Sequence, residues 1–205
     1  MIRIMGIDPG TLKVGYSFLE IDKESGRQIK YIQSGVLTFS KYRNFDERIH
    51  AIFLLIKNLV IEYAPDEVAM ESLIYVKNPL TLIKLGHARG AIVAAVLEAK
   101  KLQLFEYLPS VVKKIATGYG MSSKEFVFAL MGKERGNSSF SSFDESDAQA
   151  IAMCHVLLRK SQQTLCEKAC GEQKTPSKTV ASYLGRKPAR KQRTGDIMKI
   201  VRTTR

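Results

Sequence analysis

The first forty residues alternate between short apolar runs and turn residues. Pro9-Gly10 and Ser25-Gly26 separate runs rich in Ile, Val, Leu and Phe. Runs of this length predict strands joined by short turns, as in an antiparallel meander. The predicted strands cover residues 2–8, 14–21 and 29–39.

The pattern then changes to helical periods that alternate with two further apolar runs. Three pairs fit the capping box, in which a polar residue is followed three positions later by Glu. They are Asn44 and Glu47, Ser122 and Glu125, and Ser142 and Glu145. Asn78-Pro79 marks another helix start, because proline suits the first helical position. The predicted helices cover residues 45–63, 79–101, 110–117 (ended by Gly118), 122–132 and 142–159. The predicted strands cover residues 67–71 and 103–108.

This order of elements predicts one α/β domain over residues 1–160. Three strands in a meander, followed by alternating helices and strands, indicate a five-stranded mixed sheet flanked by helices. The helix over 79–101 is rich in Gly and Ala, which let another helix approach closely. We therefore expect that helix to form a packing or dimer surface.

Charge narrows the choice of partner. The chain has a net charge of +12 and a pI of about 9.6, which favours a polyanion such as nucleic acid. Arg3 and Asp8 interrupt the apolar start, so it does not resemble a signal peptide. We find no uninterrupted run of about 18 apolar residues. We therefore expect a cytoplasmic protein that does not bind membranes.

The C-terminal segment, residues 161–205, carries most of the excess charge. It contains 11 Lys or Arg against 3 Asp or Glu, a net charge of +8. Few large apolar residues and scattered Gly and Pro predict a largely disordered tail. The run GRKPARKQR suits either a non-specific nucleic-acid-binding arm or a solubilising tail, and the sequence favours neither.

The three cysteines indicate neither a disulfide framework nor a zinc site. Their number is odd and no secretion signal precedes them. His155, Cys166 and Cys170 fit no structural zinc pattern in their spacing.

Four carboxylates stand at positions that suit a metal site. Asp8 and Glu71 end the first and fourth predicted strands, whereas Asp144 and Asp147 share one face of a helical first turn. Taken singly, each acid has a simpler explanation. Asp8 could be a turn residue, Glu71 could form an ion pair with Lys77, and the helix dipole favours Asp144 and Asp147. Together they would repel one another without a cation. Oxygen ligands select Mg²⁺ or Mn²⁺, and two such ions about 3.5–4 Å apart suit phosphodiester hydrolysis.

Five segments, in order, resemble the RuvC family of Holliday-junction resolvases. The resemblance extends to about residue 158 and leaves the tail without a counterpart. The segments are GIDPGTLKVGY, AMESLIYVKNPLTLIKLGHARGAIVAA, FEY, VKKIATGYGMSSK and DESDAQAIAMCH.

The resemblance implies an RNase H-like fold and a homodimer that resolves four-way junctions by paired, Mg²⁺-dependent nicks in recombination and DNA repair. It implies that Asp8, Glu71, Asp144 and Asp147 are the catalytic metal ligands. The family usually works with a branch-migration motor complex, so such a motor is a further expected partner.

The resemblance also implies residues that contact DNA. Lys113 and Lys124 match positions in basic segments of the family, where they would contact phosphate or stabilise transition-state charge. Solvated surface charges are the alternative for both. Lys77 and Arg89 are weaker candidates. Family members often carry an aromatic wedge after the catalytic glutamate; here Ile74 takes that position and Tyr75 follows it.

Three other functions share some of these sequence features with a junction resolvase. An actin-like phosphotransferase also opens with a strand and Asp-x-Gly, but about 160 folded residues cannot supply its second domain. A non-catalytic junction-binding protein would have little use for all four acids. A related nuclease acting on structured RNA shares the fold, but the long KNPLTLIKLGHARG segment favours the DNA resolvase.

Overall fold

A computed structural model describes residues 1–22, 29–74, 78–134 and 139–171. The chain divides into two units, Met1–Gln162 and Gln163–Arg205. The first unit contains the whole sheet.

Five strands form one mixed sheet in the order β3-β2-β1-β4-β5. β1 pairs antiparallel with β2, and β2 pairs antiparallel with β3, as the meander predicted. β1 pairs parallel with β4, and β4 pairs parallel with β5. The strands are β1 (Ile2–Asp8), β2 (Lys13–Ile21), β3 (Ile29–Thr38), β4 (Glu67–Glu71) and β5 (Leu104–Tyr107).

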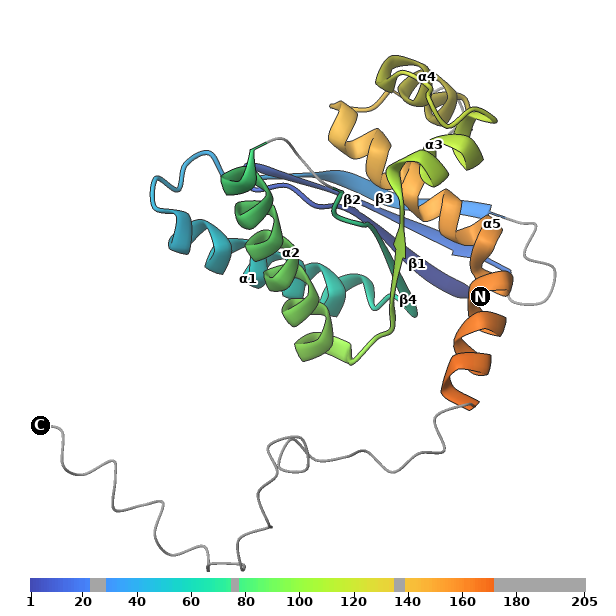
Figure 1. The fold of residues 1–205 in the computed structure, drawn as a ribbon, viewed down its shortest axis with the longest axis horizontal. Coiled ribbons are helices and arrows are strands. Elements are labelled where there is room, and N and C mark those ends of the chain that lie inside the picture. The colour runs from blue at the N-terminus through green and yellow to red at the C-terminus, as the bar shows by residue number, and fades with distance from the viewer. Residues whose placement is uncertain (23–28, 75–77, 135–138, 172–205) are drawn as a thin grey trace, which may run out of the picture. The chain divides into compact units, whose positions relative to one another are not determined.

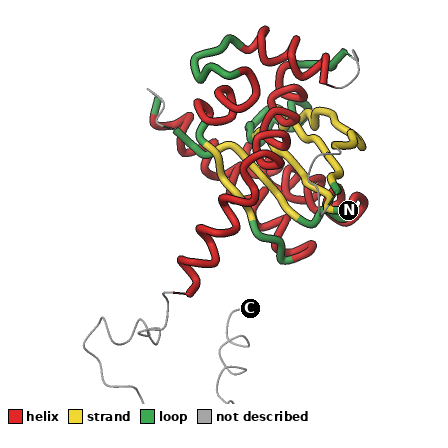
Figure 2. Tube along the Cα trace, turned by 90° about the vertical axis from the view of Figure 1, so that its right-hand side faces the viewer, coloured by secondary structure: helices red, strands yellow, loops and turns green. Residues whose placement is uncertain are grey.

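Helices cover both faces of this sheet (Figures 1 and 2). α1 and α2 pack on one face around Met5 and Ile7, and α5 packs on the other around Ile4. Alternate residues of a strand point to opposite faces, so one strand feeds both cores. The helices are α1 (Phe45–Tyr63), α2 (Pro79–Lys100), α3 (Pro109–Thr117), α4 (Lys124–Glu134) and α5 (Phe143–Gly171).

The helix starts follow from their capping residues, with one correction. The side-chain oxygen of Asn44 accepts a hydrogen bond from Asp46 N at 2.9 Å, and that of Asn78 from Leu80 N at 3.0 Å. Ser122 was the expected cap of α4, but Ser123 has this role, since its Oγ accepts from Phe126 N at 3.2 Å. The Ser122 side chain is buried in the preceding loop instead.

α5 continues to Gly171, so the predicted helix end near Arg159 was too early. The predicted disorder was therefore wrong for residues 161–171. Residues 160–170 contain helix-forming Lys, Gln, Leu, Glu and Ala and no Gly or Pro. Gly171 is the first residue that disfavours a helix. The rest of the basic tail, from residue 172, lies outside the described residues.

α2 is the one helix in the described part of the chain that is long and apolar enough to cross a membrane, judged by length and composition. Lys84 and Arg89 interrupt its apolar sequence. One side of α2 packs on α1 and the sheet through buried residues, and its other side is exposed. The buried residues are Ala88, Ile92, Ala95 and Val96.

Candidate active site

Asp8 and Glu71 lie side by side at one end of the sheet. Each is the last residue of its strand, and β1 and β4 are parallel neighbours in which Ile7 pairs with Met70. Ile7 and Met70 point into the core under α1 and α2. Strand alternation therefore directs the two carboxylates to the opposite face, which α5 covers.

Two glycines in the sheet let α5 approach closely enough to complete the cluster. A Cβ on Gly15 would lie 2.0 Å from the carbonyl oxygen of Asp144, and one on Gly6 would lie 2.3 Å from that of Ala148. No side chain fits at either position. The first turns of α5, which carry Asp144 and Asp147, thus rest directly on β1 and β2.

Three of the four predicted acids line one cavity of about 210 Å³: Asp8, Glu71 and Asp147. They come from β1, β4 and α5. Asp144 is not among the lining residues, although its charge still contributes to raising the pKa of Asp8. The structure therefore brings three of the predicted acids together and leaves the fourth at the margin.

Mutual repulsion and burial make this cavity unfavourable for carboxylate charge. Burial raises the pKa of Asp8 to about 8, and the Asp147 and Glu71 carboxylates add to the effect. Burial also raises the pKa of Glu71, again with a contribution from Asp147. A cavity that disfavours its own negative charge is typical of a cation-binding or catalytic site.

Lys124 forms an ion pair with one of the acids in this cluster. Its Nζ lies 2.9 Å from Asp147 Oδ2. Burial alone would lower the pKa of Lys124, but the hydrogen bond to Asp147 raises it above its usual value. The ion pair joins α4 to α5 at the cavity that both residues line.

The donors suit a hard divalent ion in their chemistry. All three acidic lining residues offer carboxylate oxygens, and no Cys or His is among the described residues that line the cavity. Within the described residues, no three His, Cys, Asp or Glu side chains are arranged so that they could hold a metal ion. Because Asp147 is paired with Lys124, an ion shared by these acids requires that their side chains rearrange.

The predicted DNA-contacting residues have different positions. Lys113 and Ile74 line the active-site cavity together with Lys124, and the Ile74 side chain is half exposed. Arg89 forms an ion pair with Glu106 of β5 instead of standing free for DNA. Lys77 and Tyr75 lie outside the described residues.

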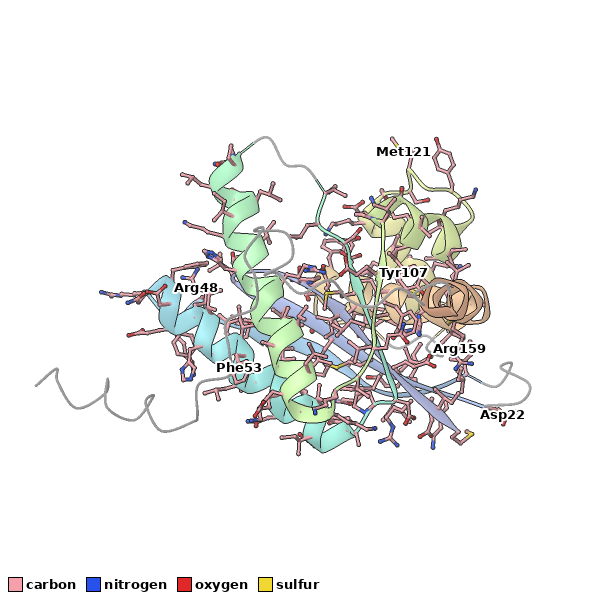
Figure 3. The ribbon with its side chains drawn as sticks, turned by 60° about the horizontal axis from the view of Figure 1, so that its bottom comes forward. Asp22, Arg48, Phe53, Tyr107, Met121 and Arg159 are labelled. Carbon is pink, nitrogen blue, oxygen red and sulfur yellow. The ribbon has the colours of Figure 1, made fainter. Side chains whose placement is uncertain are left out.

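Sequence reasoning missed a buried polar network that fixes α5 against the sheet. Glu67 accepts hydrogen bonds from Arg159 at 2.7 and 3.1 Å, and its Oε2 lies 2.9 Å from His155 Nε2. His155 Nδ1 lies 2.7 Å from the hydroxyl of Tyr107. Tyr107 and Arg159 are marked in Figure 3. The network begins at Glu67, at the opposite end of β4 from Glu71. Because it ties α5 to the sheet, it sets the position of the helix that carries Asp147.

Tyr107 also connects this network to the end of β4, through the residue that follows Glu71. Ser72 N donates to the carbonyl oxygen of Tyr107 at 2.9 Å. The only sequence signal was a histidine and an arginine four residues apart on an apolar helix. That spacing puts both on one face but does not identify their partner.

A family model described as "Crossover junction endodeoxyribonuclease RuvC" matches residues 4–155. The RuvC protein of Wolbachia sp. subsp. Brugia malayi is 36% identical over 161 residues, covering 78% of this chain and 98% of that protein. That of Cytophaga hutchinsonii is 38% identical over 153 residues and covers 74% of each chain.

Solved structures confirm the predicted RNase H-like fold. The Thermus thermophilus RuvC structure superposes with a TM-score of 0.69 at 24% identity, covering 78% of this chain and 97% of that one. The same protein in complex with Holliday junction substrate gives a TM-score of 0.68 at 22% identity. The chain belongs to the RuvC family of crossover junction endodeoxyribonucleases.

Proposed function

We propose that this chain cuts four-way DNA junctions by metal-dependent hydrolysis of phosphodiester bonds, in recombination and DNA repair. One observation carries the proposal: Asp8, Glu71 and Asp147 meet in a cavity that Lys113 and Lys124 also line. Carboxylates can hold cations, and lysines beside them can hold the phosphate. The net charge of +12 favours the polyanionic substrate.

The charged residues that line the cavity each have a role in this proposal. Asp8, Glu71 and Asp147 would hold Mg²⁺ (or Mn²⁺), with Asp144 close enough to join them through a side-chain rearrangement. When bound, two divalent ions would supply activation of water and neutralisation of charge on the leaving oxygen. Lys124 exchanges its bond with Asp147 for the phosphate, while Lys113 orients the same group. Val112 and Val127 add apolar side chains to the cavity wall.

We infer that the chain acts as a homodimer through the exposed side of α2. Exposed apolar side chains include Leu80, Ile83 and Leu97, which are 67%, 54% and 44% exposed. They form one stripe with His87, Gly90 and Ala94, because the spacing is three or four residues throughout. A second copy of the stripe would cover this surface, and two active sites would allow paired nicks.

The family supplies two further expectations that stay proposals. A branch-migration motor would move the junction to a cleavable sequence, and the protein would work in the cytoplasm. Co-sedimentation with a motor loaded on a mobile junction would test the first. If the protein bound the motor equally well with and without the junction, this result would contradict the motor proposal.

Cleavage of a labelled synthetic four-way junction tests the central proposal. In Mg²⁺, we expect wild-type protein to nick opposing strands, and Asp8→Asn to lose at least about 100-fold in rate while it still binds the junction in EDTA. Glu98→Gln is the matched control, since Glu98 is exposed on α2 away from the cavity. Full activity of Asp8→Asn would overturn the assignment.

The same assay separates the other functions. A non-catalytic binding protein would bind the junction without nicking it in any divalent ion. A nuclease for structured RNA would cut a folded RNA faster than the DNA junction. An actin-like phosphotransferase would bind ATP, which this proposal does not require.

A further inference from the structure

The loop between α3 and α4, residues 118–123, exposes two large side chains. Tyr119 is 65% exposed and Met121 is 79% exposed. Met121 lies at the outer end of this loop (Figure 3). Single exposed apolar residues are common on protein surfaces, so exposure by itself identifies nothing. The construction of the loop is the more informative feature.

Hydrogen bonds hold the backbone of Tyr119 on both sides. Its N–H donates to Thr117 Oγ1 at 3.2 Å, and its carbonyl oxygen accepts from Ser122 Oγ at 2.7 Å. The Thr117 and Ser122 hydroxyl oxygens lie 2.6 Å apart. Gly118 makes the turn with a φ of 81°. The loop thus presents Tyr119 on a fixed backbone, which lowers the entropy cost of binding a partner.

Near Gly120, the loop borders a second cavity that adjoins the active-site cavity. Gly120 lines a second cavity of about 230 Å³ together with Ser110 and Leu108. A Cβ on Gly120 would lie 3.0 Å from Ser110 O, so a side chain there would crowd the cavity floor. The second cavity shares three lining residues with the active-site cavity: Ile74, Pro109 and Lys113.

The charges around the loop suit a nucleic-acid strand. Lys113 and Lys114 lie on α3, and Lys124 lies at the start of α4. Glu125 is the acid in the first turn of α4, and Lys124 pairs with Asp147 of α5, so Lys113 and Lys114 carry the positive charge beside the loop. Proteins that bind unpaired strands combine such basic surfaces with an aromatic ring on which a base stacks. A paired base inside a duplex does not offer its face to a side chain.

We propose that Tyr119 stacks on an unpaired nucleobase of the junction, close to the phosphodiester that is cut. The second cavity holds the sugar or base between Tyr119 and the catalytic acids, and Lys113 contacts the phosphate between them. This proposal rests on the proposed nuclease function, because it takes the active-site cavity as the place of the cut bond. It gives the chain a stacking residue on a different element from Ile74 and Tyr75.

Photo-cross-linking identifies the stacked residue directly. The probe is a four-way junction with 5-iododeoxyuridine placed in turn at each nucleotide that flanks the crossover, bound in EDTA so that no cleavage occurs. Long-wavelength ultraviolet light links this base to an aromatic ring in contact with it. We expect mass spectrometry to find the link on Tyr119 at one or two positions. Cross-links confined to Tyr75 or other residues, or none at all, would overturn the proposal.

Binding of variants gives the independent measurement. Loss of one base stack weakens binding by about 5- to 100-fold, so we expect that loss in Tyr119→Ala for the four-way junction. Tyr119→Phe keeps the ring and should bind like wild type. Neither variant should change binding to a linear duplex of the same sequence. Equal junction affinity of the Ala and Phe variants would contradict the proposal. Failure of wild-type protein to cut junctions would instead contradict the nuclease function.

Discussion

The ammonium group of Lys124 lies 2.9 Å from the carboxylate of Asp147, so a residue of α4 neutralises an acid of the active-site cavity on α5. This ion pair competes with a metal ion for the same carboxylate. We predict that Lys124→Gln binds Mn²⁺ more tightly than wild type, measured by titration calorimetry. The same variant should cleave the junction about 10- to 100-fold more slowly, because it lacks charge for the transition state.

The two effects of Lys124→Gln must occur together. Weaker Mn²⁺ binding would mean that the lysine helps to arrange the site instead of occupying it. Unchanged cleavage would assign Lys124 to the solvated surface. Lys133→Gln, on the last turn of α4, is the control for general loss of positive charge.

The raised pKa of Asp8 predicts a pH dependence of stability in the metal-free protein. Between pH 3.8 and about 8 the folded state binds one more proton than the unfolded state, so this group lowers stability as the pH rises. We predict that Asp8→Asn increases the free energy of unfolding by about 1–3 kcal/mol at pH 8. The gain should shrink toward pH 5. Urea denaturation in EDTA measures it, and a destabilised variant at pH 8 would contradict the electrostatic account.

Glu67 predicts the opposite pH dependence. Burial would raise the pKa of Glu67, but hydrogen bonds from His155 and Arg159 lower it to about 2. The stabilisation is complete above the unfolded-state pKa of about 4.5 and is lost as the pH falls toward 2. We predict that Glu67→Gln costs about 3 kcal/mol at pH 7 and much less at pH 3. A cost that stays the same at both pH values would show that packing, not the ion pair, is lost.

Gly15 predicts a steric effect on the active site. An alanine Cβ would meet the carbonyl oxygen of Asp144 at 2.0 Å, so α5 must shift away from β2. We predict a loss of at least about 2 kcal/mol in unfolding free energy and a larger fractional loss of cleavage than of junction binding. Thermal unfolding and single-turnover cleavage measure these quantities. Wild-type cleavage by Gly15→Ala would mean that α5 can move without disturbing Asp144 and Asp147.

Much of the fold could be predicted from local patterns. The apolar runs identified all five strands, because each contributes side chains to a buried core. Asn44 and Asn78 marked their helix starts correctly, since a capping side chain bonds within its own turn. Ser122 and Ser123 could not be separated in the same way. The choice depends on Thr117, which binds Ser122 through the tertiary arrangement of the loop.

The candidate site was predicted less completely, because its contacts are distant in sequence. Asp8 and Glu71 could be placed at strand ends, but their shared face depends on the parallel pairing of β1 and β4. The Lys124–Asp147 ion pair joins two helices, and the Glu67–His155 contact joins a strand to a helix 88 residues away. Periodicity carries no information on such pairs. Glycine within a strand is typical of a close backbone approach, but Gly6 and Gly15 do not identify the helix that makes it.

The central claim is that Asp8, Glu71 and Asp147 form a metal-binding nuclease site. The most direct measurement is anomalous diffraction from crystals of the protein soaked in Mn²⁺, together with a junction cleavage assay of the same preparation. We expect anomalous peaks from Mn²⁺ ions that are coordinated by oxygens of all three carboxylates, with Lys124 displaced from Asp147. Cleavage-competent protein whose Mn²⁺ peaks lie away from these three residues would contradict it.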